Sequence, residues 1–377
     1  MSKIKTPEVK VTEVHSVTPR EARNTLLSGF DLNQSFFLWG PPGVGKSELV
    51  AGIAAEKGGH IIDMRMAQME PTDLRGIPFF NQITKKMDWA DPSELPTQEM
   101  ADKYPFIILF LDEMNSAPTT VQGAAYQLIL NGRIGTYVKP KNVKIIAAGN
   151  RDSDRGVTYR MPMPLANRFI HIEMREDFAS WQTWALMNGA HESVVSYLSF
   201  AEHHMFVFDT KSISKAFPTP RTWMFVSDVM NLHDVKPMSE TSLFTLVAGC
   251  VGQGVAHGFM EYRRIGSKLP NSIDILTGKV KKLEIDDISA KYSITVSMCY
   301  KLKEIDDQKL VKRKEFNEMF DNFLGFMLNN FEDELMVLGG RIAMKVYKID
   351  MDADQVSNFP KFHKRVGQHI LDAVSTV

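Results

Sequence analysis

Residues 35–39 (SFFLW) and residues 40–47 (GPPGVGKS) decide the fold of this chain of 377 residues. The first stretch has the length and apolar character of a buried strand. The second matches the pattern GxxxxGK[ST] in full, and a helical stretch follows it to about residue 57. Glycines in such a loop let backbone N–H groups turn inward around phosphate oxygens, and the helix N-terminus adds partial positive charge. The two stretches therefore predict a phosphate-binding loop in a parallel α/β sheet.

The lysine and the serine of this loop have separate expected roles. Lys46 is expected to hold the β- and γ-phosphates of a nucleotide, and Ser47 is expected to coordinate Mg²⁺. The residues predicted to bind the nucleotide are Gly40, Pro41, Pro42, Gly43, Val44, Gly45, Lys46, Ser47 and Glu48.

An acidic pair follows the longest apolar run of the chain. Residues 106–111 (FIILFL) predict a central strand, and Asp112 and Glu113 come directly after it. We expect Asp112 to organise Mg²⁺, largely through water, and Glu113 to orient and polarise an attacking water. Because a complete phosphate loop lies upstream, this pair indicates a site that hydrolyses a nucleotide.

Strands and helices alternate around these motifs. Thr18 and Glu21 flank a proline in a capping-box pattern that predicts a helix start, and Gly29 is a suitable stop. Further strands are predicted at residues 60–64, 143–148 and 169–173, and hairpin inserts near residues 76–96 and 132–142. We therefore expect an α/β core with a parallel sheet over residues 1–175.

Helical patterns replace the strand signal after Glu173. Helices are predicted from Asp177 to about Asn188, from Thr219 and Pro220 onward, and from Ser239 to about Tyr262. We expect a helical part over residues 176–265 and a mostly helical C-terminal extension over residues 266–377.

Composition narrows the classes of function. Lys and Arg total 44 and Asp and Glu total 45, so the formal net charge of −1 argues against binding of nucleic acid through bulk charge. Cys250 and Cys299 cannot form a disulfide framework and suit a reducing compartment. The longest apolar run is far shorter than the roughly 20 residues of a membrane span, and the first residues do not resemble a signal peptide. We expect a soluble, cytoplasmic protein.

Five segments, taken in order, resemble the AAA+ ATPases. They are GPPGVGKS (40–47), FIILFLDEMN (106–115), KIIAAGN (144–150), PLANRF (164–169) and TPRTW (219–223). Within that group the chain is similar to the MoxR-like branch, which is related to dynein-type domains. DLRGIPFF (73–80) with MDWADPSELP (87–96) resembles the insert that this branch carries in its second helix, and residues 131–150 resemble the hairpin before its sensor strand.

The resemblance implies an αβα core, a helical lid over residues 176–265, and ATP with Mg²⁺ as cofactors. It also implies a closed ring of subunits, expected to be a hexamer, with ATP at the subunit interfaces. Asn150 resembles the sensor that positions water against the γ-phosphate, and Arg168 resembles the arginine finger that reaches a neighbour's ATP. Arg221 resembles the second sensor on the lid. Glu113, Asn150 and Arg168 form the predicted catalytic set, and Arg221 is predicted to bind the nucleotide together with the phosphate loop.

The segment after Asn150 departs from the family pattern. This branch often continues with a proline, whereas here a charged run begins that contains Arg151 and Arg155, with Arg160 close behind. Each of these arginines is an alternative finger to Arg168. The run also loosely resembles McrB-like relatives that use GTP, so ATP is favoured and GTP stays open.

The function that the resemblance implies is an ATP-driven, chaperone-like remodeller of protein complexes. The family often works with a separate protein that has a von Willebrand type A domain, and the ring would act on a protein client. A McrB-like DNA motor or restriction component is the first alternative, disfavoured by the near-neutral charge. A nucleotide switch or scaffold is the second, disfavoured by intact Glu113 and Asn150. Residues beyond 266 resemble no part of the family.

Overall fold

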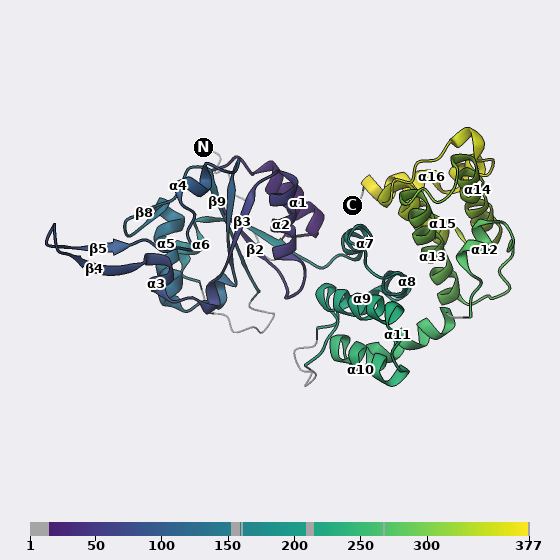
Figure 1. Ribbon diagram of the computed structural model, residues 1–377, viewed down its shortest axis with the longest axis horizontal. Coiled ribbons are helices and arrows are strands. Elements are labelled where there is room, and N and C mark those ends of the chain that lie inside the picture. The colour runs from purple at the N-terminus through teal and green to yellow at the C-terminus, as the bar shows by residue number, and fades with distance from the viewer. Residues whose placement is uncertain (1–14, 152–158, 160, 209–214, 267, 376–377) are drawn as a thin grey trace, which may run out of the picture. The chain divides into compact units, whose positions relative to one another are not determined.

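The computed structural model describes residues 15–151, 159, 161–208, 215–266 and 268–375 of the chain. It divides into two compact units, the first ending at Glu176 and the second beginning at Asp177 (Figure 1). The first unit contains all the strands among the described residues, and the second unit is helical there. Within the same described ranges, no helix has the length and apolar character needed to cross a membrane.

A parallel sheet of six strands forms the centre of the first unit, in the order β1, β10, β2, β9, β6, β3. The strands are β1 (Ser16–Val17), β2 (Ser35–Trp39), β3 (His60–Arg65), β6 (Ile107–Asp112), β9 (Val143–Gly149) and β10 (Phe169–Met174). The predicted α/β fold with a parallel sheet is confirmed, and the short strand β1 is an addition to it. This order places β9 between β2 and β6, so the loops after these three strands meet at one edge of the sheet.

Helices cover both faces of this sheet (Figure 1). Phe36 of β2 belongs to the same hydrophobic cluster as α1 (Pro19–Ser28) and α2 (Lys46–Glu56), whereas Phe37 belongs to the cluster that contains α5 (Thr119–Asn131). Successive side chains of a strand point to opposite faces, so one continuous apolar strand contributes to two cores. The unit therefore has three layers, a sheet between two layers of helices. Its shorter helical segments are η1 (Met66–Gln68), α3 (Pro71–Arg75), α4 (Gln98–Ala101), η2 (Met114–Ser116) and α6 (Met163–Ala166).

The first helix begins with the predicted capping box. Thr18 Oγ1 accepts a hydrogen bond from the backbone N–H of Glu21 at 3.2 Å, and Glu21 Oε2 accepts one from the N–H of Thr18 at 2.7 Å. Gly29 caps the other end, where its N–H donates to the carbonyl groups of Thr25 and Leu27.

The first unit also contains two antiparallel hairpins that are separate from its six-stranded sheet. They are β4 (Ile77–Asn81) with β5 (Lys86–Ala90), and β7 (Arg133–Ile134) with β8 (Tyr137–Val138). The shorter hairpin contacts the base of the longer one, because Thr136 Oγ1 donates to Asp91 Oδ1 at 2.6 Å. The two inserts are therefore joined to each other as well as to the core.

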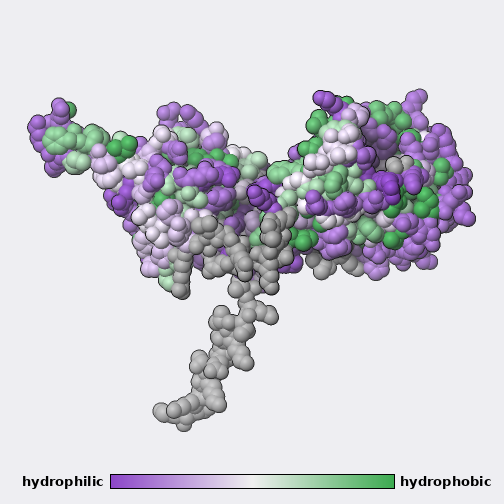
Figure 2. Space-filling view, turned by 90° about the horizontal axis from the view of Figure 1, so that it is seen from below, coloured by the Kyte–Doolittle hydropathy of each residue, from purple (hydrophilic) through white to green (hydrophobic). Residues whose placement is uncertain are grey.

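The longer hairpin, β4–β5, exposes large apolar side chains. Phe79 and Phe80 are 47% and 57% exposed, and Ile83 in its turn is 92% exposed. Figure 2 shows this hairpin at the left, with hydrophobic residues along it and a hydrophilic tip. Its apolar residues therefore face outward instead of joining either core of the unit.

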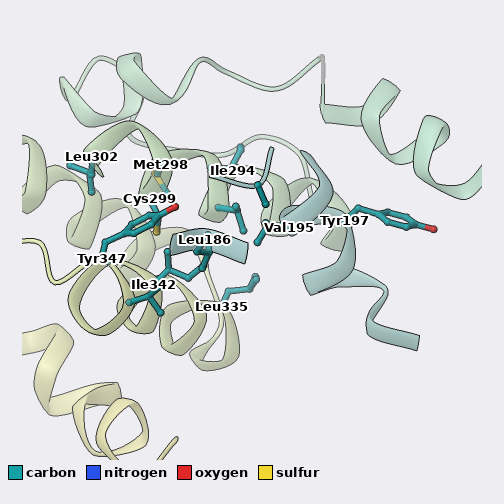
Figure 3. Packing of buried hydrophobic residues seen from close by; sticks show 14 of the residues in the cluster. Leu186, Val195, Tyr197, Ile294, Met298, Cys299, Leu302, Leu335, Ile342 and Tyr347 are labelled. Carbon is teal, nitrogen blue, oxygen red and sulfur yellow. The ribbon is translucent and has the colours of Figure 1, made fainter. Parts of the chain in front are cut away.

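The second unit packs its helices around one hydrophobic cluster. The helices are α7 (Phe178–Met187), α8 (Glu192–Phe200), α9 (Pro220–Val235), α10 (Glu240–Val251), α11 (Gln253–Gly266), α12 (Ser272–Leu276), α13 (Ile288–Asp307), α14 (Arg313–Asn330), α15 (Asp333–Gly340) and α16 (Phe359–Ser375), with η4 (Glu202–His204), η5 (Arg341–Val346, a π-helix) and η6 (Ala353–Gln355). The cluster includes residues from α7 through α16, so residues 177–265 and 266–370 share one core. Figure 3 shows part of it, where Cys299 lies near Tyr347. Cys250 and Cys299 are both free thiols.

The prediction of one helix from Ser239 to Tyr262 is wrong. The segment forms two helices, α10 and α11, which are separated at Gly252, where φ is 82° and ψ is 155°. That backbone conformation is accessible almost only to glycine, so the chain turns there. Another glycine, Gly258, lies close to Tyr197, since an added Cβ would come within 2.8 Å of the tyrosine hydroxyl.

Candidate nucleotide-binding site

The phosphate loop lies between β2 and α2, as its sequence predicts. Gly43 and Gly45 have φ values of 77° and 98°, which turn the backbone in a way that other residues rarely adopt. Gly45 is also the N-cap of α2, so no side chain of the N-cap residue bonds to the first turn of the helix. The N–H groups at this helix end are thus placed to bind an anion, and the helix dipole favours it.

Lys46 is the first residue of α2, and its side chain folds back into the loop. The residue is only 8% exposed. Its ammonium group donates to the carbonyl oxygens of Gly40 at 2.7 Å and Pro41 at 3.1 Å, and to Asn150 Oδ1 at 3.2 Å. The lysine therefore lies where the phosphate-binding pattern requires a positive charge.

The magnesium ligands predicted from the sequence lie together. Ser47 Oγ donates to Asp112 Oδ2 at 3.0 Å, which joins the start of α2 to the end of β6. Hydroxyl and carboxylate oxygens are the ligands that Mg²⁺ prefers. The residues present therefore fit this ion, and Ser47 and Asp112 are the residues that would hold it.

A second carboxylate adds to the negative charge of this region. Asp63 is on β3, the strand next to β6, where the register aligns Asp63 with Phe110 and Arg65 with Asp112. Burial raises the pKa of Asp63, and the negative charge of Asp112 raises this pKa further. Sequence reasoning missed Asp63, because only the strand pairing places it near the acidic pair.

Glu113 follows Asp112 in a conformation unusual for a glutamate. Its φ is 56° and its ψ is 32°, in the left-handed region. The turn is held by two hydrogen bonds, from the N–H of Glu113 to Asp112 Oδ1 at 2.8 Å and from the N–H of Ser116 to the Glu113 carbonyl at 2.9 Å. A non-glycine residue in this region stores strain that its surroundings must offset, and such residues concentrate at functional sites.

Asn150 lies at the end of β9, between the phosphate loop and the acidic pair. Its side-chain oxygen accepts the hydrogen bond from Lys46, and its carbonyl accepts one from Asn115 Nδ2 at 2.7 Å. The structure thus brings together Lys46, Ser47, Asp112 and Asn150 by direct bonds, with Glu113 beside them. Asn115 was not among the predicted site residues, since its role depends on a neighbour 35 positions away.

Two of the predicted arginines, Arg168 and Arg151, have contacts that the structure describes. Arg168 is exposed in the turn between α6 and β10, where its N–H donates to the Leu165 carbonyl at 3.0 Å. Arg151 lies 3.6 Å from Glu173 in an ion pair. Arg155 and Arg160 lie outside the described residues.

Two further predicted residues, Glu48 and Arg221, are exposed. Glu48 lies in the first turn of α2. Arg221 is the second residue of α9 and belongs to the second unit, so its approach to the nucleotide stays a prediction.

One family of known proteins matches the part of the chain that contains this geometry. Residues 36–174 match the family described as "ATPase family associated with various cellular activities (AAA)". Among solved structures, the chain is similar to the RuvB Holliday junction branch migration motor of Thermotoga maritima, with 14% identity over 82% of this chain and 85% of that chain and a TM-score of 0.35. It is also similar to NtrX from Brucella abortus in complex with ATP, with 16% identity over 95% of this chain and 70% of that chain and a TM-score of 0.36. At these values neither structure bears on the reaction or the partners of this chain.

The family match and the site coincide. The matched residues contain the phosphate loop, the acidic pair and Asn150. The match also spans the strands from β2 to β10, which place these groups at one edge of the sheet. Residues 36–174, which contain the candidate site, are therefore the part of the chain that matches the AAA ATPase family.

Proposed function

We propose that this protein binds ATP at the phosphate loop and hydrolyses it to drive the remodelling of a protein complex. The observation that carries the proposal is the convergence of Lys46, Ser47, Asp112 and Asn150 beside Glu113. A phosphate cradle, oxygen ligands for a cation and a carboxylate for water are the three parts that hydrolysis of a phosphoanhydride requires.

Each residue has one task in the proposed reaction. Lys46 exchanges its loop carbonyl partners for phosphate oxygens, and Glu113 orients the attacking water and accepts its proton. Asn150 donates from its amide toward the γ-phosphate or the water. Bound Mg²⁺, held through Ser47 and Asp112, would neutralise charge on the phosphates.

We further propose that the active form is a ring of the MoxR-like kind, with Arg168 reaching the ATP of the neighbouring subunit. The exposure of Arg168 supports this role, because a residue that acts in trans must lie on the surface of its own subunit. Arg221 would act on the nucleotide from the helical unit of its own subunit, as the second sensor.

The exposed hairpin β4–β5 supports a protein client. Phe79 and Phe80 are about half exposed although both are large and apolar, and burial of such side chains against a partner is favourable. The ring would transmit the cycle of hydrolysis to the client through this hairpin. A separate protein with a von Willebrand type A domain is the partner that the family resemblance implies.

The first experiment is the rate of ATP turnover per subunit, measured against protein concentration with Mg²⁺, with and without DNA. Turnover per subunit that rises steeply with concentration and ignores DNA is the expected result, because shared sites form only on assembly. A strong stimulation by DNA would instead favour a DNA motor. Constant, very low turnover despite nucleotide binding would favour a switch.

A further inference from the structure

Asn115 joins the loop after the acidic pair to the loop after β9. It lies in η2, two residues after Glu113, and is only 1% exposed. Its Nδ2 group donates to the carbonyl of Asn150 at 2.7 Å. Asn150 in turn accepts from Lys46 through its side chain, so Asn115 holds the backbone of the residue that faces the lysine.

The Asn115 side chain has little freedom to move. An added Cβ at Gly149 would come within 2.2 Å of Asn115 Oδ1 and 2.9 Å of its Cγ, so the amide lies directly against the end of β9. The backbone of Asn115 is fixed as well, because its carbonyl accepts from the N–H of Tyr159 at 2.7 Å. Contacts on both the side chain and the backbone thus set the position of this amide.

The side-chain amide of Asn115 adds little to the net stability of the fold. Asn115 Oδ1 is buried and has no hydrogen-bond partner among the described residues. A buried acceptor without a partner loses its bonds to water, and this penalty offsets the gain from the bond that Nδ2 makes. The clear effect of the amide is on position, since it couples Asn150 to the strained turn that carries Glu113.

We propose that Asn115 is a positioning residue for ATP hydrolysis, which rests on the function proposed above. It fixes the carbonyl of Asn150 and, through it, the direction of the Asn150 side chain relative to Lys46 and Glu113. Binding of ATP depends mainly on the loop and Lys46, so it does not need this contact. The orientation of the attacking water between Asn150 and Glu113 does depend on the bond from Asn115, because small displacements of reacting groups lower the rate strongly.

The test compares the purified full chain with Asn115→Leu, which keeps the approximate shape of the side chain and removes the N–H donor. We expect kcat for ATP to fall by about 10- to 100-fold, with KM and the dissociation constant of ATP changed by less than about 3-fold. Asn115→Ser, which removes volume and is too short to reach Asn150, is the second variant and should show the same split between kcat and KM.

Gln122→Met is the matched control. Gln122 is fully buried on α5, its Nε2 donates to the Ala117 carbonyl at 3.0 Å, and its Oε1 also has no partner among the described residues. This variant removes a comparable buried amide that does not bond Asn150. Its kcat should equal that of the wild type even if its melting temperature falls.

The outcomes separate the two proposals. If both Asn115 variants turn over ATP like the wild type while Lys46→Ala and Glu113→Gln are inactive, the role of Asn115 is wrong and the proposed function stands. If Gln122→Met loses kcat as strongly as Asn115→Leu, Asn115 acts only through stability and the inference fails. If Lys46→Ala and Glu113→Gln both hydrolyse ATP at the normal rate, the proposed function itself is wrong.

Discussion

At the scale of single residues, the surroundings of Lys46 explain why the site suits a negatively charged ligand. Lys46 is a nearly buried ammonium that donates to the neutral oxygens of Gly40, Pro41 and Asn150. Removing a charge from water is costly, and each bond to a neutral oxygen repays less of that cost than a bond to a charged group. A phosphate group would repay it more fully, since bonds between two charged groups are stronger.

Lys46→Ala should therefore weaken ATP binding by at least ~10- to 100-fold, the value of one hydrogen bond between charged groups. The unfolding temperature without nucleotide should hardly fall. Isothermal titration calorimetry measures the affinity. Lys57→Ala, which removes the same charge at the other end of α2, is the control and should bind ATP normally. Unchanged affinity in Lys46→Ala would contradict the assignment of the phosphate site.

Glu113→Gln should bind ATP like the wild type and hydrolyse it ~10²- to 10⁴-fold more slowly, the usual contribution of a general base. The amide keeps the size of the side chain but cannot accept the proton of water. Single-turnover kinetics with bound ATP measure the step. Glu99→Gln, an exposed carboxylate paired with Lys103, is the matched control. A normal rate in Glu113→Gln would mean that another group orients the water.

At the scale of elements, turns and caps decide where helices begin and end. The Gly252 backbone is accessible almost only to glycine, so Gly252→Ala should lower the free energy of unfolding by about 1–3 kcal/mol. Gly249→Ala, inside α10, should raise it by about 0.5–1 kcal/mol, because an added Cβ there meets nothing within 4 Å and alanine favours helix. Urea denaturation measures the free energy of unfolding of both variants. Equal changes of the same sign would contradict the claim that the backbone at Gly252 requires glycine.

The capping box of α1 predicts a dependence of stability on pH. Hydrogen bonds from the Thr18 backbone and side chain lower the pKa of Glu21 from its ordinary value of 4.5. The stabilisation is therefore complete above pH 4.5, and it is lost as the pH falls through the lower pKa of the folded state. Thr18→Ala should cost about 1 kcal/mol at pH 7 and reduce this loss at acidic pH.

Thr25→Ala, an exposed position within the same helix, is the control for the capping box. It should leave both the stability at pH 7 and its pH dependence nearly unchanged. Denaturation curves between pH 3 and pH 7, a range chosen around the ordinary pKa, compare the two variants. Equal effects of both threonines would show that the cap contributes nothing specific.

Local chemistry explains which elements could be predicted from the sequence. The capping box of Thr18, the strand before Gly40 and the acidic pair after β6 each depend on neighbours within a few residues, so their patterns are visible in the chain. The break at Gly252 could not be predicted, because a glycine within an apolar helical run is compatible with close packing of helices as well as with the end of a helix. Asp63 and Asn115 gain their roles from strand pairing and from β9, and no short pattern contains that information.

At the scale of the whole molecule, the proposal that subunits share their active sites can be tested without a client. Lys46→Ala subunits lack the phosphate contact, and Arg168→Ala subunits lack the proposed finger. Mixed one to one, they should recover hydrolysis. About a quarter of the interfaces would pair an intact phosphate loop with an intact arginine, since each of the two positions is filled correctly half the time.

The control mixture combines Lys46→Ala with Glu113→Gln. Both residues belong to the same unit of the same subunit, so no interface between these variants contains a complete site, and hydrolysis should stay absent. ATP turnover of the mixtures is the measurement, with exchange of subunits verified by native mass spectrometry. Recovery only in the Arg168 mixture would establish that this arginine acts across an interface. If neither mixture recovers although the subunits exchange, Arg168 is not the residue that acts in trans, and Arg151, Arg155 and Arg160 are the next to substitute.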